Sequence, residues 1–459
     1  MSIQDLRGFL ELLAESGQLC RIKAEVDPEL EISAITSRVS KQSGGGKALW
    51  FENVKGHQTP VLTNLFGSPQ RAAWALWTEN VETLANLLRG ELARRKESSV
   101  TDRLRNLLEE PEYLPRLIGQ PPCQEVVFSD AVDLGIIPAL KAWPGDGGRF
   151  ITLPLVYTRD PATGRQNCGM YRVQIHDRQR VTINWGKHSD GARHYTAYGA
   201  RGKRMPVAIA IGGDPTMIYA ATVPLPSGID EAVFAGFLRQ RGLATAKCLS
   251  ADLEVPAAAE FILEGYLEPG ETLPEGPFGN HTGSYTPVGE AAVMHVTTLT
   301  HRRNPLYPCT VVGPPPMEDC YLAKATERLF LPLLQQDFPE IVDINMPMEG
   351  IFHHCALVAM RCDRPGHGKE LLRGLWNKGF LQRARLLLVL DERTDIQNLS
   401  ESFWKALNRI DPQRDVLIED GRIGFDATGL QEPGRDELAP SAEIVELVQQ
   451  RWAEYGIDD

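Results

Sequence analysis

The hydrophobic periodicity of the chain changes along its length, and this change limits the possible folds more than any other feature. From about residue 123 to residue 315, apolar and polar residues alternate in 150–159 and 169–176, and 205–211 and 292–300 add further strand-like segments. Alternation with a period of two indicates strands with one buried face. Because only 230–239 has the spacing of a helix, we predict a barrel-like sheet for this central region.

The regions on either side combine helices with strands. Helical spacing occurs at 3–16 and 81–95, with a short strand near 48–51 between them. Beyond residue 317, helices alternate with short apolar strands, an order typical of an α/β layer. We therefore predict three domains followed by a terminal helix, with the boundaries 1–118, 119–317, 318–440 and 441–459.

The predicted terminal helix has an apolar face. Ile444, Leu447, Val448 and Trp452 follow one side of it. A helix with such a face at a chain end often docks on a neighbouring subunit, so we expect a homo-oligomer.

Composition and charge exclude several classes of function. The 459 residues include 48 basic and 60 acidic side chains, and the net charge of −12 argues against a nucleic-acid-binding surface. The N-terminus lacks the basic and apolar regions of a signal peptide, and no run of about 18 apolar residues predicts a membrane span. The eight cysteines form no C-x-x-C pair, which is typical of reduced thiols. We expect a cytoplasmic protein that binds no nucleic acid.

The stiffest segment of the sequence surrounds an acidic residue. Two prolines and three glycines lie around Glu275 between Pro274 and Gly283. Proline fixes φ and glycine permits close approach of the backbone, so a carboxylate held there can be pressed against a ligand. A surface turn with a solvated glutamate is the alternative interpretation.

A second segment, 167–172, ends in an arginine. In a straight strand Asn167 and Arg172 would point to opposite faces, but a bulge at Gly169 would reset the alternation and turn Arg172 inward. There its guanidinium could bind a carboxylate through two parallel hydrogen bonds. An ordinary arginine on a surface strand is the alternative.

Two further groups carry basic side chains. Segment 183–188 and the basic residues that follow it, up to Arg204, form either a solvated loop or the seat of a phosphate. His353 and His354 adjoin on a predicted strand, so we expect them to face opposite sides.

Taken together, these features resemble the UbiD-like family of prenylated-flavin-dependent (de)carboxylases. The resemblance covers nearly the whole chain and includes, in order, the segments 51–56, 167–172, 252–257, 264–266, 274–283, 338–343 and 411–412. It implies an N-terminal α/β domain, a central flavin-reductase-like split β-barrel and a C-terminal α/β domain that builds dimers or hexamers. It also implies prenylated flavin mononucleotide (prenylated FMN), a divalent metal such as manganese, and potassium, with a flavin prenyltransferase as supplier of the cofactor.

The resemblance assigns roles to particular residues. Arg172 matches the catalytic arginine of the family and Glu275 its partner carboxylate, and Asn280 stands at a third catalytic position. Asn167 and His188 match residues that hold the metal and the cofactor phosphate. The implied cofactor contacts are Asn167, Met170, Tyr171, Arg172, Trp185, Lys187, His188, Lys378 and Arg409.

Two positions depart from the family pattern. Asn280 replaces the acidic proton donor of many relatives, and this form is associated with relatives that act on hydroxylated aromatic acids. The metal-binding glutamate of the family is expected four residues before Cys248, where this chain has Ala244. Loss of an oxygen ligand predicts weaker binding of a divalent ion.

The sequence therefore predicts reversible, non-oxidative decarboxylation of a small carboxylic acid. A hydroxybenzoate-like aromatic acid is favoured, and an α,β-unsaturated acid is the other substrate class. Two alternatives stay open: a flavin oxidoreductase on the same barrel, and a cofactor-binding homologue whose catalysis is impaired by the changes at Ala244 and Asn280.

Overall fold

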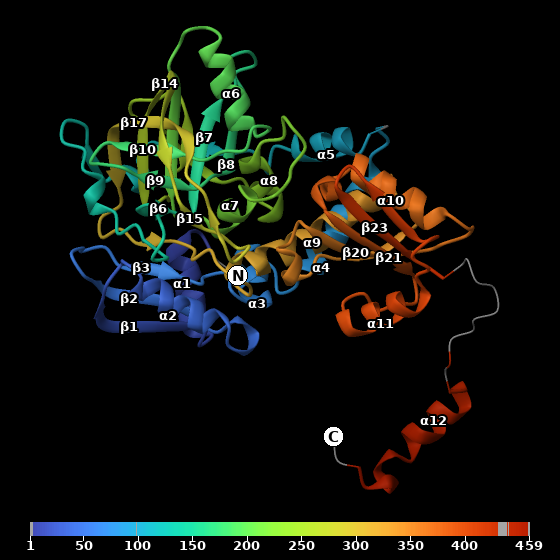
Figure 1. Cartoon of the computed structure of the whole chain (residues 1–459). Coiled ribbons are helices and arrows are strands. Elements are labelled where there is room, and N and C mark those ends of the chain that lie inside the picture. Colours follow the sequence, from blue (N-terminus) through green and yellow to red (C-terminus); the bar gives the residue numbers. More distant parts are fainter. Residues whose placement is uncertain (1–2, 98, 430–437, 439, 458–459) are drawn as a thin grey trace.

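The computed structural model describes residues 3–97, 99–429, 438 and 440–457. A strand-rich central region lies between two smaller α/β regions (Figure 1). This arrangement confirms the predicted fold class. No helix within the described ranges is long and apolar enough to cross a membrane.

The N-terminal region contains a four-stranded sheet of order β1-β2-β3-β18. Strand β18 (Tyr307–Pro308) comes from the end of the central region, so the two regions share this sheet. The other elements are α1 (Leu6–Glu15), β1 (Leu19–Val26), α2 (Glu31–Ser40), β2 (Ala48–Val54), β3 (Val61–Thr63), α3 (Pro69–Ala75), α4 (Val81–Arg94) and α5 (Val100–Leu108). Asp5 is the N-cap residue of α1, and its Oδ1 accepts the N–H groups of Arg7 and Gly8 at 3.0 and 3.1 Å.

The central sheet has nine strands and curls into a partly closed barrel (Figure 1). Eight follow the order β6-β9-β10-β17-β14-β11-β7-β8, and β5 pairs with β17. Its strands are β5 (Val126–Phe128), β6 (Arg149–Ile151), β7 (Pro154–Arg159), β8 (Gln166–Met170), β9 (Val173–Ile175), β10 (Arg180–Ile183), β11 (Met205–Ile211), β14 (Phe261–Glu275) and β17 (Gly289–His301). The smaller elements of this region are β4 (Arg116–Leu117), α6 (Asp190–Gly199), α7 (Pro215–Ala220), α8 (Glu231–Leu238), β12 (Ala244–Lys247), β13 (Glu254–Pro256), β15 (Phe278–Gly279) and β16 (Tyr285–Thr286).

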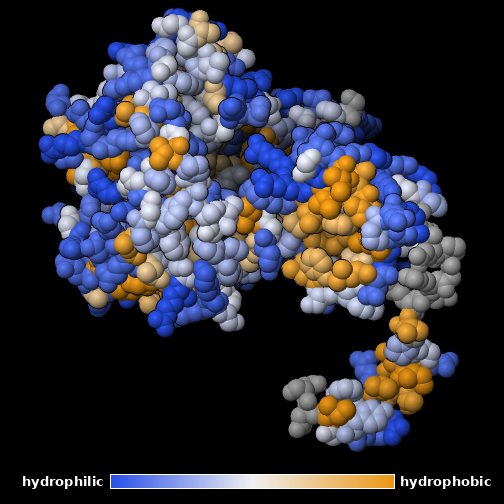
Figure 2. All heavy atoms as spheres, viewed as in Figure 1, coloured by the Kyte–Doolittle hydropathy of each residue, from blue (hydrophilic) through white to orange (hydrophobic). Residues whose placement is uncertain are grey.

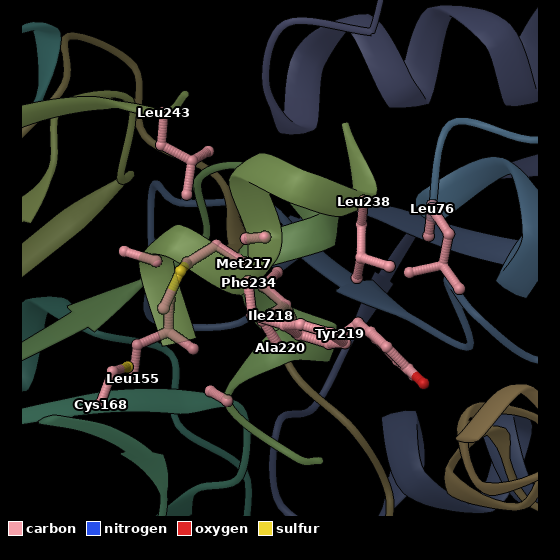
Figure 3. Packing of buried hydrophobic residues seen from close by; sticks show 14 of the residues in the cluster. Leu76, Leu155, Cys168, Met217, Ile218, Tyr219, Ala220, Phe234, Leu238 and Leu243 are labelled. Carbon is pink, nitrogen blue, oxygen red and sulfur yellow. The ribbon is translucent and has the colours of Figure 1, made fainter. Parts of the chain in front are cut away.

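The two faces of the central sheet pack against different layers. On β11, Val207 and Ile209 belong to the core inside the barrel, whereas Ala208 and Ala210 belong to the core shared with α7 and α8. Figure 3 shows part of this second core, where side chains from β7, β8, α7 and α8 meet. The small alanines allow the helices to approach the sheet closely, which positions the beginning of α8 beside β8.

The C-terminal region is a five-stranded sheet of order β19-β20-β21-β23-β22. Val358 packs in a core with residues of α10, and its neighbour Leu357 packs in another core with Ala406 of α11, so helices cover both faces. Helix α9 contributes Leu329 to the central core and Leu334 to the C-terminal core, and it thereby joins the two regions. The elements are α9 (Glu318–Asp337), β19 (Ile341–Asn345), β20 (Cys355–Met360), α10 (His367–Asn377), β21 (Leu386–Asp391), α11 (Leu399–Arg409), β22 (Val416–Glu419) and β23 (Arg422–Ala427).

A terminal helix is present as predicted: α12 (Ala442–Gln450) is followed by a short 3-10 turn, Trp452–Tyr455. None of the α12 residues is buried. Its apolar face, which includes Ile444 and Val448, is exposed in Figure 2. Docking of this face on a neighbouring subunit stays a prediction.

Two elements near the site were not predicted from periodicity. Helix α6 buries only Gly191 and His194, so it lacks the apolar stripe that marks a helix. The first half of β14 is buried on both sides, and Glu264 within it is fully buried, so alternation is absent there.

Candidate active site

Arg172 and Glu275 form a buried ion pair in the central region. Arg172 donates from Nε to Oε1 of Glu275 at 2.7 Å and from Nη2 to Oε2 at 2.8 Å. The side chain of Glu275 is 1% exposed and that of Arg172 is 15% exposed. The guanidinium also lies 4.5 Å from the ring centroid of Phe278. This geometry excludes both a solvated glutamate and an ordinary surface arginine.

Neighbouring amides hold the ion pair in place. Asn184, which follows β10, donates from Nδ2 to Oε2 of Glu275 at 2.8 Å. Gln174 of β9 accepts the N–H of Gly276, the next residue along the chain, at 2.8 Å. The carboxylate is therefore fixed in one orientation. Sequence reasoning assigned no role to Asn184 or Gln174, because only the fold brings them to the end of β14.

Arg172 reaches the site without the predicted bulge. Strand β8 pairs with β7 in unbroken register through Gly169, so the predicted bulge is wrong. Strand structure stops at Met170 and resumes at Val173, and the intervening bend resets the alternation. Gly169 is required for another reason, since a Cβ there would lie 2.4 Å from the ring of Tyr171.

Asn280 lies in the turn between β15 and β16. Its Nδ2 donates to Oγ1 of Thr286 at 3.0 Å, and its Oδ1 accepts the N–H of His281 at 2.8 Å. The side chain thus closes its own turn. Within the described residues it forms no hydrogen bond with Arg172 or Glu275.

Glu231 is a candidate metal ligand that sequence reasoning missed. It stands at the start of α8, where its Oε2 accepts the N–H of Cys168, the neighbour of Asn167, at 2.9 Å. Burial raises the pKa of Glu231 to about 8, and the carboxylates of Asp230 and Asp190 add to this. No described cation pairs with it. A buried carboxylate without a positive partner is suited to a bound cation.

The donor atoms of the residues assigned to the metal suit a divalent ion. Glu231 and Asn167 offer oxygen and His188 offers nitrogen, and manganese accepts both. His188 is exposed in the loop between β10 and α6. No three His, Cys, Asp or Glu side chains converge within the described chain, so a metal site here would depend on the amide of Asn167.

Ala244 is not part of this group. It is exposed on β12, a strand that pairs with β4 and β13. A carboxylate at this position would lie in solvent. The prediction of a gap in the metal site at Ala244 is therefore wrong, and the carboxylate beside Asn167 comes from Glu231 instead.

The expected flavin contacts include an aromatic group. Tyr171 and Trp185 meet edge to face with ring centroids 6.0 Å apart, and the ring of Tyr195 also lies 6.0 Å from that of Trp185. Met170, just before the bend, donates its N–H to the carbonyl of Ala221 at 3.0 Å. These contacts fix the segment between Asn167 and Arg172.

The basic residues after segment 183–188 do not converge on a single phosphate seat. Arg193 pairs with Asp190, and Arg204 pairs with Glu268 at 2.5 Å. Lys187 remains exposed with His188 in the loop that precedes α6. A loop that leads into a helix N-terminus favours binding of an anionic group.

Lys378 and Arg409 form ion pairs inside the C-terminal region. Lys378 is 62% exposed and pairs with Asp337 at 2.5 Å, and Arg409 pairs with Asp391. Neither of these pairs includes a residue of the central region. Their assigned contact with the cofactor stays a prediction.

Another part of the C-terminal region does meet the central region. His353 and His354 lie in the turn before β20, and their ring centroids are 4.4 Å apart, so the prediction that they face opposite sides is wrong. The ring of His353 lies 5.8 Å from that of His281. Arg383 and Arg385 lie close enough to His353 to lower its pKa. Sequence reasoning missed both arginines, because their closeness to His353 depends on this turn.

The class of protein to which this fold and its buried arginine–glutamate pair belong follows from comparisons with known proteins. The chain matches three family models described as 3-octaprenyl-4-hydroxybenzoate carboxy-lyase: the N-terminal domain over residues 10–89, the Rift-related domain over 116–315 and the C-terminal domain over 320–435. The chain belongs to the UbiD family.

Related proteins match the chain over its whole length. An uncharacterized protein of Archaeoglobus fulgidus is 43% identical over 481 residues, which cover 99% of both chains. One from Aquifex aeolicus is 41% identical over 457 residues, which cover 99% of this chain and 93% of that protein.

Solved structures of UbiD-class enzymes have the same architecture. An evolved dimeric form of HmfF from Pelotomaculum thermopropionicum, in complex with prenylated FMN, has a TM-score of 0.82, 28% identity and coverage of 97% and 100% of the two chains. The closed form of vanillic acid decarboxylase from Sedimentibacter hydroxybenzoicus has a TM-score of 0.86, 27% identity and full coverage of both chains. Its open form has a TM-score of 0.79, 27% identity and 98% coverage of each chain. These relatives support a decarboxylase with a flavin cofactor.

Proposed function

We propose that the protein removes carbon dioxide from a small unsaturated acid, reversibly and without net oxidation, with prenylated FMN as its cofactor. A hydroxybenzoate-like aromatic acid is the favoured substrate, and an α,β-unsaturated acid is the other class. The observation that carries the proposal is the buried, doubly hydrogen-bonded pair of Arg172 and Glu275 in a chain of the UbiD family. The prenylated FMN bound to HmfF and the vanillic acid decarboxylase among the relatives support the cofactor and the substrate class.

Arg172 is suited to hold the substrate carboxylate. Glu275 occupies Nε and Nη2 of the guanidinium, whereas Nη1 forms no hydrogen bond within the described residues and can donate to an anion. Glu275 orients the guanidinium and can hold the proton that replaces carbon dioxide on the substrate carbon. When bound, prenylated FMN supplies the electron sink for the carbon–carbon bond that breaks.

Three side chains would hold a divalent ion and the cofactor phosphate. Glu231 is a buried carboxylate beside the strand that carries Asn167, and His188 lies in the loop before α6. Lys187 in the same loop would neutralise the phosphate. We assign manganese as the metal, because these oxygen and nitrogen donors suit it.

We also propose a homodimer or homohexamer that obtains its cofactor from a flavin prenyltransferase. The exposed apolar face of α12 supports contact with a second subunit. HmfF, a relative of the same architecture, has been solved in an evolved dimeric form, which supports a homodimer.

Activity is expected to depend on prenylated FMN. Protein produced together with a flavin prenyltransferase should decarboxylate members of a panel of hydroxybenzoic and cinnamic acids, and protein produced without it should be inactive. The cofactor is identified by the mass and absorption spectrum of the released flavin. Equal activity of the two preparations, or activity with unmodified FMN, would contradict the proposal.

Asn280 is expected to bias the enzyme towards hydroxylated aromatic acids. An amide cannot supply the proton that a carboxylic acid supplies, and general acid catalysis typically raises a reaction rate by about 10²–10⁴-fold. A ring hydroxyl lessens this need, because it spreads the charge that develops on the ring. Hydroxybenzoic acids should therefore react faster than cinnamic acids, and Asn280→Asp should speed the latter by roughly tenfold.

Thr286→Ala provides the matched control for Asn280→Asp. Both changes remove the hydrogen bond from Nδ2 of Asn280 to Thr286, but only Asn280→Asp adds a carboxyl group. The ratio of kcat/KM values for the two acids should change in Asn280→Asp alone. A native preference for acids without a ring hydroxyl, or an equal change in both variants, would refute this role.

A further inference from the structure

Three rings meet where the central and C-terminal regions join. His281 follows Asn280 in the turn between β15 and β16, and its ring centroid lies 5.2 Å from that of Phe352 and 5.8 Å from that of His353. Phe352 and His353 lie 5.4 Å apart in the turn before β20. We call these three residues the ring contact. It connects the turn that contains Asn280 with the C-terminal sheet.

The turn that carries Phe352 and His353 has unusual backbone dihedral angles. Ile351 and Phe352 have φ values of 43° and 51°, in the left-handed region that large side chains rarely adopt. The N–H of Ile351 bonds to the carbonyl of Met348, and that of His354 bonds to the carbonyl of Gly350, at 2.9 and 3.0 Å. Backbone conformations of this kind persist only where the surroundings hold them, and they cluster at functional sites.

We propose that Phe352 and His353 are positioning residues that hold the C-terminal region in its closed arrangement, against the turn that carries Asn280. The vanillic acid decarboxylase, which has been solved in closed and open forms, has TM-scores of 0.86 and 0.79 with this chain, so the structure is nearer to the closed form. The role of the ring contact in holding the two regions together does not depend on which reaction the protein catalyses. Its effect on catalysis rests on the proposed function.

Several charged groups face the three rings. They are Asp319 beside His281, with Lys41 near Asp319, and His354, Arg383 and Arg385 beside His353, with Glu349 near Cys355. Oδ2 of Asp319 lies 4.0 Å from Nδ1 of His281, but burial raises the pKa of Asp319 to about 6, so its attraction for a protonated His281 fades in acid. The arginines oppose a positive charge on His353 at every pH.

These groups make the ring contact sensitive to acid. Burial lowers the pKa of His353 to about 4, and His354, His281, Arg383 and Arg385 add to the effect. When the contact opens, His353 returns towards its ordinary pKa of about 6.5. The open form therefore binds more protons between about pH 6.5 and pH 4, so the contact is fully present above this range and weakens as the pH falls through it.

Hydrogen–deuterium exchange of the full-length, flavin-loaded protein tests the proposal. The amides of 278–286 and 348–354 report opening of the ring contact, after correction for the intrinsic effect of pH on exchange. From pH 7.5 to pH 5.0, protection of both segments should fall by about tenfold in the native protein. Phe352→Ala should lower it by a similar factor already at pH 7.5, and His353→Gln should remove most of the pH response.

Two controls separate the contact from other effects. His367→Gln alters a histidine of the same region that pairs with Asp363, and it should keep the native pH response. Amides of the β20–β21 ladder should be unchanged in all variants, which excludes unfolding of the region. Native protection in Phe352→Ala, or a native pH response in His353→Gln, would overturn the proposal.

An activity measurement connects the contact to catalysis. Phe352→Ala should lower kcat/KM with its flavin content unchanged. Inactivity of the native protein would refute the proposed function while leaving the exchange result intact. Loss of protection in Phe352→Ala without loss of kcat/KM would overturn the positioning role.

Discussion

Replacing Glu275 by glutamine is expected to slow decarboxylation by about a hundredfold, which corresponds to roughly 3 kcal/mol. Glutamine keeps the size of the side chain but removes the charge that balances the guanidinium of Arg172. Since Glu275 is 1% exposed, water cannot replace the lost contact. The flavin should stay bound, because the other assigned cofactor contacts are unchanged. Steady-state rates with matched flavin content measure the effect.

Arg172 and Glu275 should behave as a unit. Arg172→Ala is expected to lose about as much rate as Glu275→Gln, and the double variant little more than either. Arg172→Lys should not restore the rate, because an ammonium group cannot form the two parallel hydrogen bonds.

Arg178→Ala is the matched control for the arginine variants. Arg178 also donates from Nε and Nη2 to a carboxylate, that of Asp133, but its side chain is 80% exposed. An exposed pair contributes little, so native turnover is expected. Near-native turnover of Arg172→Ala or Glu275→Gln would disprove the assigned roles, as would additive losses in the double variant.

Replacing Glu231 by glutamine is expected to weaken binding of manganese by at least about a hundredfold. The amide oxygen of glutamine can still accept the N–H of Cys168, so the local structure should survive. The negative charge that a cation requires is lost, however. Metal analysis after dialysis against a chelator, followed by manganese titration, measures the change in holoenzyme made with the flavin prenyltransferase.

Ala244→Glu serves as the comparison, because it adds a carboxylate at the exposed position on β12. It should leave manganese affinity unchanged. If Glu231→Gln kept the metal as the native protein does, or if Ala244→Glu tightened binding, the placement of the site at Glu231 would be wrong.

Much of the fold could be predicted because its signals are local. The predicted strand at 205–211 and the helical spacing at 81–95 both appear in the structure, as β11 and α4. Helix α6 could not be predicted in this way, because it buries too few side chains to produce a stripe. The break between β8 and β9 at Tyr171 could not be predicted either. Both strands are so short that the sequence pattern does not reveal where one ends and the next begins.

The candidate site was predictable to the extent that its residues stand in distinctive local sequence. Glu275 lies among prolines and glycines that stiffen its backbone, so it was recognised without its partner. Arg172 is 103 positions away, and only the pairing of β-strands across the barrel brings the two side chains together. Gln174 carries no local signal, and Asn184 was noted only as part of segment 183–188, because nothing in the sequence connects either amide with Glu275.

The sequence by itself determined the order of three regions, the stiff segment around Glu275 and the family to which the chain belongs. These follow from side-chain periodicity, backbone restriction and ordered motifs, all of which act over short stretches of chain. Only the tertiary structure decided that the carboxylate beside Asn167 is Glu231 and that Ala244 faces solvent. It likewise decided that His281 meets Phe352 and His353. The physical reason is that these contacts depend on how α8 packs on β8 and how α9 joins the central and C-terminal cores, which no local pattern records.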